Sequence, residues 1–387
     1  MPLGLHGLAR PGEEIVAEPA SAHLTLADLL EAIEFCFEQG WTDGLPVVPP
    51  TPERVQAFLG ALELPPDTVV GALPEQERVI TAEKLAINAV LAGCLPSYLP
   101  VLVAAVRAVT APAFGLAAAW RDAAGVAPLL IVNGPVRRLI DLNAGAGLFG
   151  PGARANATIG RALSLLLRNT CDGRPDGTEA TSFGHPGQFT YCIAEDEEGT
   201  NWEPLHVERG LSAETSAVTA VLAGAPHLVR TRPTGSPEEV LRPVADALSA
   251  TAHYQGAHVV VLGPVHRAAL ERAGWSKADV RAFLAEHARR SVAALKEAGL
   301  LPGALTPGDA HRYPALLREA DLVVVAAGGP GGADSVVVPP WAHVPTSQPV
   351  LCPVAVSAMT STPGQDAPAL ATPDDSAARP SSAMADG

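Results

Sequence analysis

The chain contains 387 residues, of which 48% are hydrophobic and 17% are charged. This length and composition are typical of a folded protein with about two domains and a large core, and they exclude a chain that is disordered throughout. The net charge of −15 and the lack of a Lys/Arg cluster argue against a nucleic-acid partner.

The N-terminal region predicts helices that are separated by Pro- and Gly-rich turns. Residues 1–24 have no periodic pattern and are expected to form a flexible arm. A first helix is expected after Thr25, which suits an N-cap, a second at the segment TPERV, with proline in its first turn, and a third from Thr81. Between the first two helices, Trp41 and Asp43 either line a pocket or pack against a domain edge.

Cys94 lies at a break between two expected helices, just before the second of them. A thiol near a helix N-terminus has a lowered pKa and can act as a nucleophile. The alternative is that Cys94 is a small core residue, which is the commoner environment of a free cysteine. Cys94 is therefore a candidate catalytic nucleophile.

An apolar run that ends in Asn133-Gly-Pro predicts a buried strand followed by a tight turn. Ligands bind beyond the carboxyl ends of strands in open α/β sheets, so Asn133 is a candidate substrate-binding residue. The Gly-rich loop that follows leads into a helix, where Asn156 and Arg161 could orient an anionic substrate. The alternative is a Gly/Pro turn with a capping Asn. The loop matches neither a Walker motif nor GxGxxG, so no nucleotide cofactor is expected.

The segment Gly184–His206 combines histidines with acidic side chains. His185, Glu195 and His206 are candidate acid–base residues, because histidine titrates near neutrality. His185, Glu203 and His206 form a candidate divalent-metal site, since Glu203-x-x-His206 places two ligands on one face of a helix. The alternatives are structural histidines and, for the run EDEEG, a solvated turn. Trp202, beside these residues, is a candidate substrate contact.

The second half repeats the alternation of strands and helices, and this predicts an α/β fold of two layered halves with mainly parallel strands. The stretches LLIVNGPVRRLIDL and HVVVLGPVHRAALE resemble each other. They indicate either a degenerate duplication or the recurrence of ordinary strand-to-helix turns. Gly328 and Gly329 follow a buried strand, where they either contact substrate or form a flexible turn.

These patterns predict four parts: an arm (1–24), an N-terminal α/β domain with the Gly-rich loop and the His/Glu segment (25–215), a C-terminal α/β domain (216–356) and a disordered tail (357–387). The tail is rich in Ala, Ser, Pro and Asp, which cannot build a core.

The five cysteines are scattered, odd in number and lack CxxC spacing, as expected in a reducing cytosol. No charged N-terminal stretch leads into an apolar segment, and the apolar runs fall short of the ~20 residues of a membrane span. We therefore expect a cytoplasmic protein with no membrane partner.

Several segments, taken as a set, resemble a largely uncharacterised bacterial family that is similar to the UGSC-motif (seleno)proteins. They include WTDGLPVVPPTPERV, IVNGPV, GPGARANATIGRAL, HPGQFTYCIAEDEEGTNWEPLHVERG and AGGPGGADS, and the resemblance covers residues 25–355. It implies no defined reaction. The chain has no Gly-Ser-Cys motif, so a thiol or selenium redox role does not transfer from that motif.

The hypothesis favoured by the sequence is an enzyme, a lyase or hydrolase, acting on a small anionic organic molecule, with a divalent metal as a candidate cofactor. The Ala-rich, Lys-poor composition is typical of high-GC bacteria, in which a role in specialised metabolism is expected. The alternative is a non-catalytic or metal-binding subunit that works with a thiol or selenol redox protein. Either a homo-oligomer or such a redox partner is expected.

Overall fold

The computed structural model describes residues 20–119, 125–171, 183–231, 236–251, 256–314, 317–340 and 347–355. The expected tail at 357–387 and most of the expected arm lie outside these residues. Of the arm, only residues 20–24 are described.

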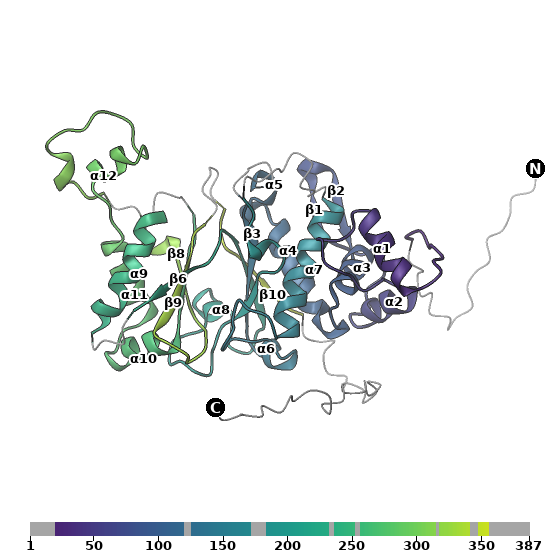
Figure 1. The fold of residues 1–387 in the computed structure, drawn as a ribbon. Coiled ribbons are helices and arrows are strands. Elements are labelled where there is room, and N and C mark those ends of the chain that lie inside the picture. The colour runs from purple at the N-terminus through teal and green to yellow at the C-terminus, as the bar shows by residue number, and fades with distance from the viewer. Residues whose placement is uncertain are drawn as a thin grey trace, which may run out of the picture.

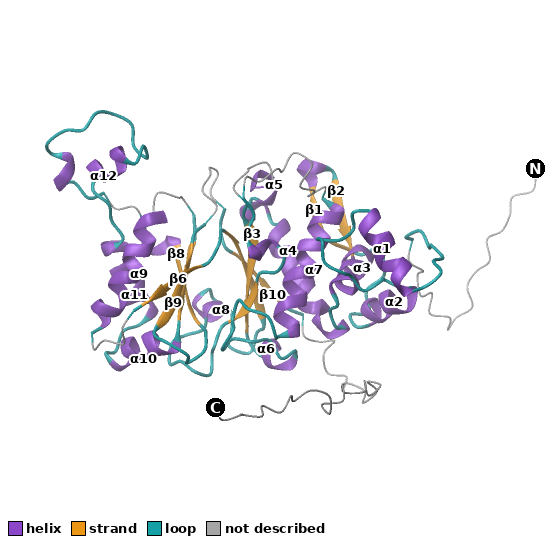
Figure 2. Cartoon of the chain, in the orientation of Figure 1, coloured by secondary structure: helices purple, strands orange, loops and turns teal. Residues whose placement is uncertain are grey.

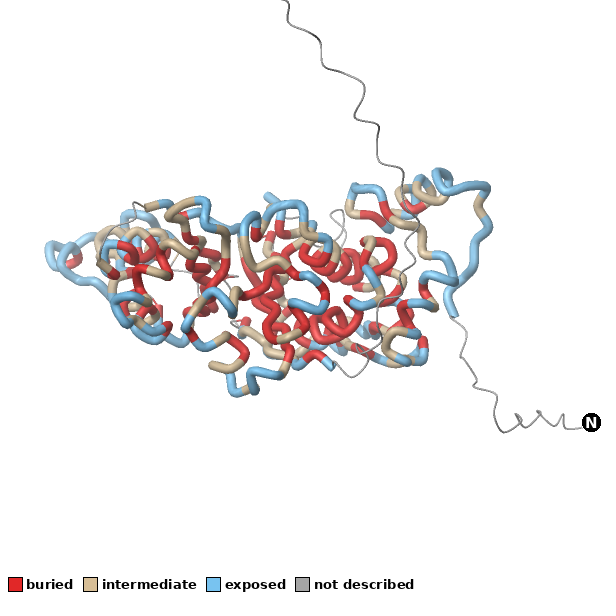
Figure 3. The backbone as a smooth tube through the Cα atoms, turned by 90° about the horizontal axis from the view of Figure 1, so that it is seen from below, coloured by how far each residue is buried: buried red, intermediate tan, exposed pale blue. Residues whose placement is uncertain are grey.

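Two four-stranded sheets lie face to face in the middle of the molecule, and helices cover the outer face of each (Figures 1 and 2). The strand order of the first sheet is β10 (Val350–Pro353), β5 (Ala217–Ala223), β3 (Ala127–Asn133) and β4 (Cys192–Ala194). The order of the second is β6 (His227–Arg230), β9 (Asp334–Val338), β7 (His258–Leu262) and β8 (Leu322–Ala326). Buried aliphatic side chains such as Ile131, Val221 and Val259 fill the space between the sheets. The tube in Figure 3 shows the buried residues concentrated inside each half.

The sheets are mixed, so the expectation of mainly parallel strands is wrong. Among the described strands, β3 pairs with β4 and β7 with β8 in parallel, whereas β5 and β9 run antiparallel to their neighbours. The sequence predicts β3, β7 and β8 of the parallel pairs, but β5, with the sequence AVTAVLA, is rich in alanine and lacks the signature of a strand. The α/β class itself agrees with the structure.

In each sheet, one edge strand pairs with a strand that is distant from it in the sequence. Strand β6 follows β5 along the chain but pairs with β9 of the second sheet, and β10 follows β9 but pairs with β5 of the first. The expected division at 215/216 therefore cuts through the first sheet, because β5 and β10 lie beyond residue 215. The common strand order is compatible with the duplication hypothesis, which stays a prediction.

Helices on the first sheet form the larger half. They are α1 (Leu29–Glu38), α2 (Pro52–Gly60), α3 (Ala82–Ala92), α4 (Leu99–Thr110), α5 (Leu116–Ala119), α6 (Val136–Leu139) and α7 (Arg154–Thr170), with a hairpin of β1 (Val69–Leu73) and β2 (Arg78–Thr81). Asp28, rather than Thr25, caps α1, while Thr51 and Thr81 cap α2 and α3. Helix α7 buries Ile159 and Leu163 against this half, and each such side chain contributes about 1.5–3 kcal/mol by leaving water.

The second half has fewer helices around its sheet. They are α9 (Pro237–Thr251), α10 (Pro264–Arg272), α11 (Lys277–His287) and α12 (Val292–Glu297), the last of which projects from the layers (Figure 1). The single turn α8 (Leu205–Glu208) lies between the two sheets. No single helix of the described residues is long and apolar enough to span a membrane, although the bent pair Pro96–Thr110 and Pro112–Ala119 reaches that length and composition together.

Candidate functional site

The carboxyl ends of the parallel strands of both sheets meet at one place, which we call the junction. The backbone N–H of Asp196, just after β4, donates to the carbonyl of Ala326 at the end of β8 (2.7 Å). The N–H of Gly328 donates to the carbonyl of Ala144 (2.8 Å). Strand ends of this kind are the usual place for ligands in α/β proteins, so the junction is the first region to test for chemistry.

Glu195 is the hub of the junction and is completely buried. Its Oε2 accepts hydrogen bonds from Asn133 Nδ2 and the Leu205 N–H, both at 2.7 Å. Its Oε1 accepts from Lys277 Nζ at 2.8 Å and from the Ala326 N–H at 3.4 Å. With both oxygens engaged by strand ends of the two halves, Glu195 holds the halves together and has no free oxygen for a substrate proton.

The run EDEEG is not a solvated turn as a whole, because its first three acids are bound by cations and amides. Glu197 accepts from Asn133 Nδ2 (3.0 Å) and the Gly134 N–H (2.7 Å) and pairs with Arg137 (2.8 Å). Asp196 pairs with Arg267 (3.0 Å). Glu198, with 52% of its side chain exposed, is the nearest to a solvated residue, although it also contacts Arg137 (3.0 Å).

Gly134 makes this arrangement possible. Its φ of +82° is accessible to glycine at little cost, and a Cβ at this position would lie 2.5 Å from the Thr215 carbonyl oxygen. The turn after β3 therefore brings the Gly134 N–H onto Glu197 only because the residue is glycine.

Three buried side chains of the junction, those of His206, Asn133 and Arg267, have hydrogen-bonding atoms left over. Neither ring nitrogen of His206, nor Oδ1 of Asn133, nor Nη1 of Arg267 has a hydrogen-bond partner among the described residues. His206 Nδ1 lies 4.0 Å from Glu197 Oε1, too far for a hydrogen bond. In contrast, His266 bonds Ser335 through Nδ1 and Thr231 through Nε2, both at 2.7 Å.

Two glycine-rich loops, one from each half, pack together at the junction. A Cβ on Gly329 would lie 2.6 Å from Ala146, so Gly329 serves close packing of the loops, whereas Gly328 has a φ of +106° that favours glycine. Asn156 holds the first loop, because its side chain accepts from the Asn143 N–H (2.8 Å) and donates to the Asn143 carbonyl (2.9 Å) and the Cys192 carbonyl (3.2 Å). The expected substrate contacts of these residues are thus occupied by protein.

Cys94 lies away from the junction, in the core of the first half. Burial raises the pKa of its thiol to about 12, and Sγ donates to the Thr158 carbonyl (3.2 Å). This environment favours the alternative that Cys94 is a small core residue, because burial disfavours the thiolate that a nucleophile needs.

His185 lies near the opposite end of the first sheet. Its Nδ1 accepts from the Gly187 N–H (3.2 Å), its ring stacks edge-on to Tyr191, and Tyr191 donates to the Gly224 carbonyl just after β5 (3.0 Å). Burial lowers the pKa of His185. Because β5 is antiparallel to β3, this end is a strand length from Asn133, and His185 does not meet His206.

The expected metal site is therefore not assembled. Glu203 is exposed and contributes its backbone carbonyl to Lys277 Nζ (2.7 Å). No group of three His, Cys, Asp or Glu side chains within the described ranges is placed to hold a metal ion.

Arg161 and Trp202 also have structural partners in place of substrate. Arg161 forms a two-bond pair with Asp43 (2.7 and 2.8 Å) and donates to the carbonyls of Leu45 and Pro46. The Trp202 indole donates to the Trp275 carbonyl (2.8 Å), and its ring packs in the core of the second half.

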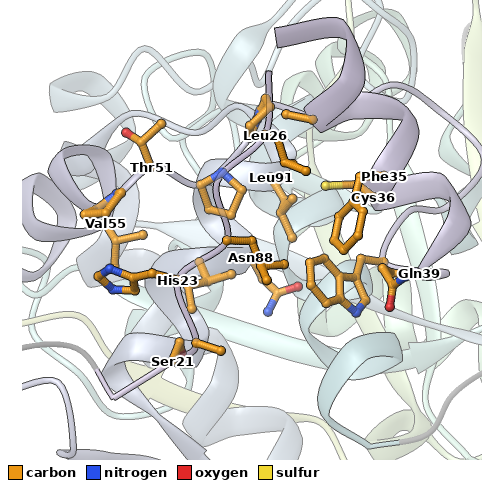
Figure 4. Close-up of a pocket in the computed structure, with 18 of the residues that line it drawn as sticks. Ser21, His23, Leu26, Phe35, Cys36, Gln39, Thr51, Val55, Asn88 and Leu91 are labelled. Atoms are coloured by element: carbon orange, nitrogen blue, oxygen red, sulfur yellow. The ribbon is translucent and has the colours of Figure 1, made fainter. Parts of the chain in front are cut away.

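A second region, far from the junction, contains a pocket of about 930 Å³ among α1, α2, α3 and residues 21–26. Its lining is mainly apolar and includes Leu26, Phe35, Val55, Ile87 and Leu91. Figure 4 shows Phe35, Leu91 and Asn88 gathered around the same space. Trp41 lines this pocket, which agrees with one of its two interpretations from the sequence.

The carboxamides of Asn88 and Asn169 form a polar end of the pocket. Asn169 Nδ2 donates to Asn88 Oδ1 (2.8 Å) and to the Trp41 carbonyl (3.2 Å), and Asn88 Nδ2 donates to the Lys84 carbonyl (2.9 Å). A carboxamide has two N–H donors and two acceptor lone pairs. Asn88, which lines the pocket, thus keeps one N–H and one acceptor site after these bonds.

One wall of the pocket is residues 21–26, which Glu83 attaches to the body. The buried Glu83 carboxylate accepts from the backbone N–H groups of Ala20 (3.1 Å) and Ser21 (2.9 Å). Burial opposes ionisation, but the bonds from Ser21 and Ala20 together with nearby His23 lower the pKa of Glu83. The carboxylate is thus charged at neutral pH, and it fixes the wall through two hydrogen bonds.

Comparison with known proteins gives no match to a family model and none to a curated protein. The junction and the pocket are therefore the two regions of the described residues that bear on function. Of the residues that define them, Arg137, Glu197, Lys277 and Asn88 were missed from the sequence. The RR pair after the NGP turn was a usable signal for Arg137, whereas nothing local to Lys277 or Asn88 distinguishes them from ordinary helix residues.

Proposed function

We propose that this protein binds a small, mainly apolar organic molecule in the pocket of the first half. The supporting observation is the pocket itself, whose volume of about 930 Å³ and apolar lining with a few polar groups match small-molecule sites in general. Burial raises the pKa of Cys36, which lines the pocket, and this disfavours a thiolate nucleophile there. Binding is therefore favoured over catalysis here.

Fluorescence titration with N-phenyl-1-naphthylamine, an uncharged apolar dye, tests this proposal. Saturable binding is expected for the wild type. Ala32, on the pocket side of α1, is the position to block, and Ala32→Phe should weaken dye binding by about tenfold or more, because the ring occupies the space the dye needs.

The matched control is Ala57→Phe, the same change at an exposed position of α2 outside the pocket lining. It should bind as the wild type does. A wild type that shows no saturable binding, or equal affinity in both variants, contradicts the proposal.

A second proposal is a lyase or hydrolase site at the junction, favoured by the buried His206 and Asn133 atoms that have no partner. An imidazole with both nitrogens available can take a proton from one atom of a substrate and give one to another. The junction cations Arg137, Lys277 and Arg267 are each matched by a carboxylate, so this site suits a neutral substrate better than the anion expected from the sequence.

Turnover of a panel of small neutral esters, amides and hydroxy compounds, followed by mass spectrometry, tests the second proposal. Turnover by the wild type should be lost in His206→Gln and retained in His227→Gln, a change at an exposed histidine of β6. Turnover that survives in His206→Gln contradicts it.

A further inference from the structure

We infer that the pocket selects uncharged ligands that carry a hydrogen-bonding group at one end, and that it rejects anions. This inference rests on the proposed binding function and specifies the ligand class. It reverses the anionic substrate expected from the sequence.

The charges around the pocket are the first observation. Among the described residues, the lining contains two carboxylates, Asp28 and Glu83, and one histidine, His23, but neither a lysine nor an arginine. A ligand anion would lose part of its hydration on entering and would find no cation to replace it. It would also approach the two carboxylates, of which Glu83 is held in its charged form by the bonds to Ala20 and Ser21.

The carboxylates do not select cations either. Each Glu83 oxygen already accepts from one backbone N–H group, and Asp28 Oδ1 caps α1 by accepting from the Glu31 N–H (2.9 Å). A ligand ammonium would have to share these carboxylates with the N–H groups that hold the wall and α1 in place. An uncharged ligand leaves these bonds as they are.

The polar end supplies the second observation. Asn88 is 3% exposed, and its carboxamide keeps one N–H and one acceptor site after its bonds to Asn169 and Lys84. An amide or hydroxyl group on the ligand can both donate and accept, so it satisfies both sites. The surrounding side chains of Phe35, Ile87 and Leu91 then cover the apolar remainder of the ligand.

Two dyes with the same aromatic skeleton provide the charge test: N-phenyl-1-naphthylamine, which is neutral, and 8-anilinonaphthalene-1-sulfonate, which adds a sulfonate. Titrations of the wild type and of Ala32→Phe isolate the binding that occurs in the pocket. We expect the sulfonate dye to bind the pocket at least about tenfold more weakly than the neutral dye, because no cation compensates its desolvation. Equal or tighter pocket binding of the sulfonate overturns the inference.

Displacement of the neutral dye tests the polar end. Naphthalene-2-carboxamide should displace it at concentrations about tenfold below those of naphthalene-2-carboxylate. In Asn88→Leu the advantage of the amide should shrink by about fivefold, the value of one neutral hydrogen bond. An unchanged amide preference in a folded Asn88→Leu, or a carboxylate that displaces as well as the amide in the wild type, contradicts the inference.

Failure of this inference differs from failure of the proposed function. A protein to which the neutral dye does not bind has no such pocket function. A protein that binds the neutral and the anionic dye equally well, with both lost in Ala32→Phe, has the pocket but not its selectivity.

Discussion

The junction and the pocket differ in how their polar groups are used. At the junction, ionisable side chains are buried and bonded mostly to one another, as Glu195 is to Lys277 and Asn133. In the pocket, apolar side chains dominate, and Asn88 retains hydrogen-bonding capacity. The difference shows that a dense cluster of charged residues at strand ends can serve to hold the two halves together. The space that could admit a ligand lies instead in the mainly apolar pocket.

The largest expected effect is the loss of stability when the junction hub is removed. Glu195→Ala leaves Lys277 as a buried charge without this carboxylate and removes an acceptor from Asn133, which should reduce the free energy of unfolding by about 3–5 kcal/mol. Urea denaturation measures this value. Glu198→Ala, at a half-exposed position of the same run, should cost less than about 1 kcal/mol. Similar losses in the two variants would show that Glu195 is no hub.

A smaller loss of stability is expected when Arg161, which fixes the segment after α1, is replaced. Arg161→Ala removes a two-bond pair with Asp43 and the bonds to Leu45 and Pro46, which should cost about 1–3 kcal/mol. A double-mutant cycle with Asp43→Asn, read by thermal and urea unfolding, isolates the pair. A coupling free energy near zero would return Arg161 to the list of candidate ligand-binding residues.

Substitution of Glu83 should change the rate at which a bound dye leaves the pocket, because Glu83 holds the wall at residues 21–26. In Glu83→Gln the amide cannot accept both N–H groups as the carboxylate does, so residues 21–26 should open more often and the neutral dye should dissociate about three to ten times faster. Stopped-flow fluorescence measures the dissociation rate.

The same prediction has a pH dependence. Because the folded protein lowers the pKa of Glu83, the stabilisation of the wall is present above the ordinary value of 4.5 and is lost as the pH falls through the lowered value. Dissociation from the wild type should accelerate below pH 4.5, whereas Glu83→Gln should show no such step. A wild-type rate that is flat down to the lowered pKa contradicts the role of Glu83.

The smallest expected effect concerns the modification of Cys94 by a thiol reagent. With the thiol pKa raised to about 12 by burial, Cys94 should remain unmodified by a thiol reagent at pH 8 in the folded protein and react only after unfolding. Cys352, the least buried of the five cysteines, should react first. Peptide mapping by mass spectrometry identifies the modified residue, and rapid modification of Cys94 would restore it as a nucleophile.

Local signals in the sequence predicted much of the fold. Pro52 in the first turn of α2 and the apolar run before Asn133 indicate a helix start and a buried strand, and both are confirmed. Strand β5 was missed because an alanine-rich run fits a helix as well as a strand, and its place between β3 and β10 depends on distant partners.

The sequence predicted where the junction residues lie but not what each of them does. Asn133, Glu195 and His206 do come together, as strand-end residues should. The role of Glu195 depends on Lys277, 82 residues away, which no local pattern connects to it. Likewise, Cys94 has the local context of a reactive thiol, and only the packing of the first half shows that it is buried.

The central claim is that the pocket, rather than the junction, is where this protein binds its ligand. Titration of N-phenyl-1-naphthylamine into the wild type, Ala32→Phe and His206→Gln tests it most directly. We predict tight, saturable binding to the wild type and to His206→Gln and a loss of about tenfold or more in Ala32→Phe. Binding that survives in Ala32→Phe and disappears in a folded His206→Gln would contradict the claim and assign the ligand to the junction.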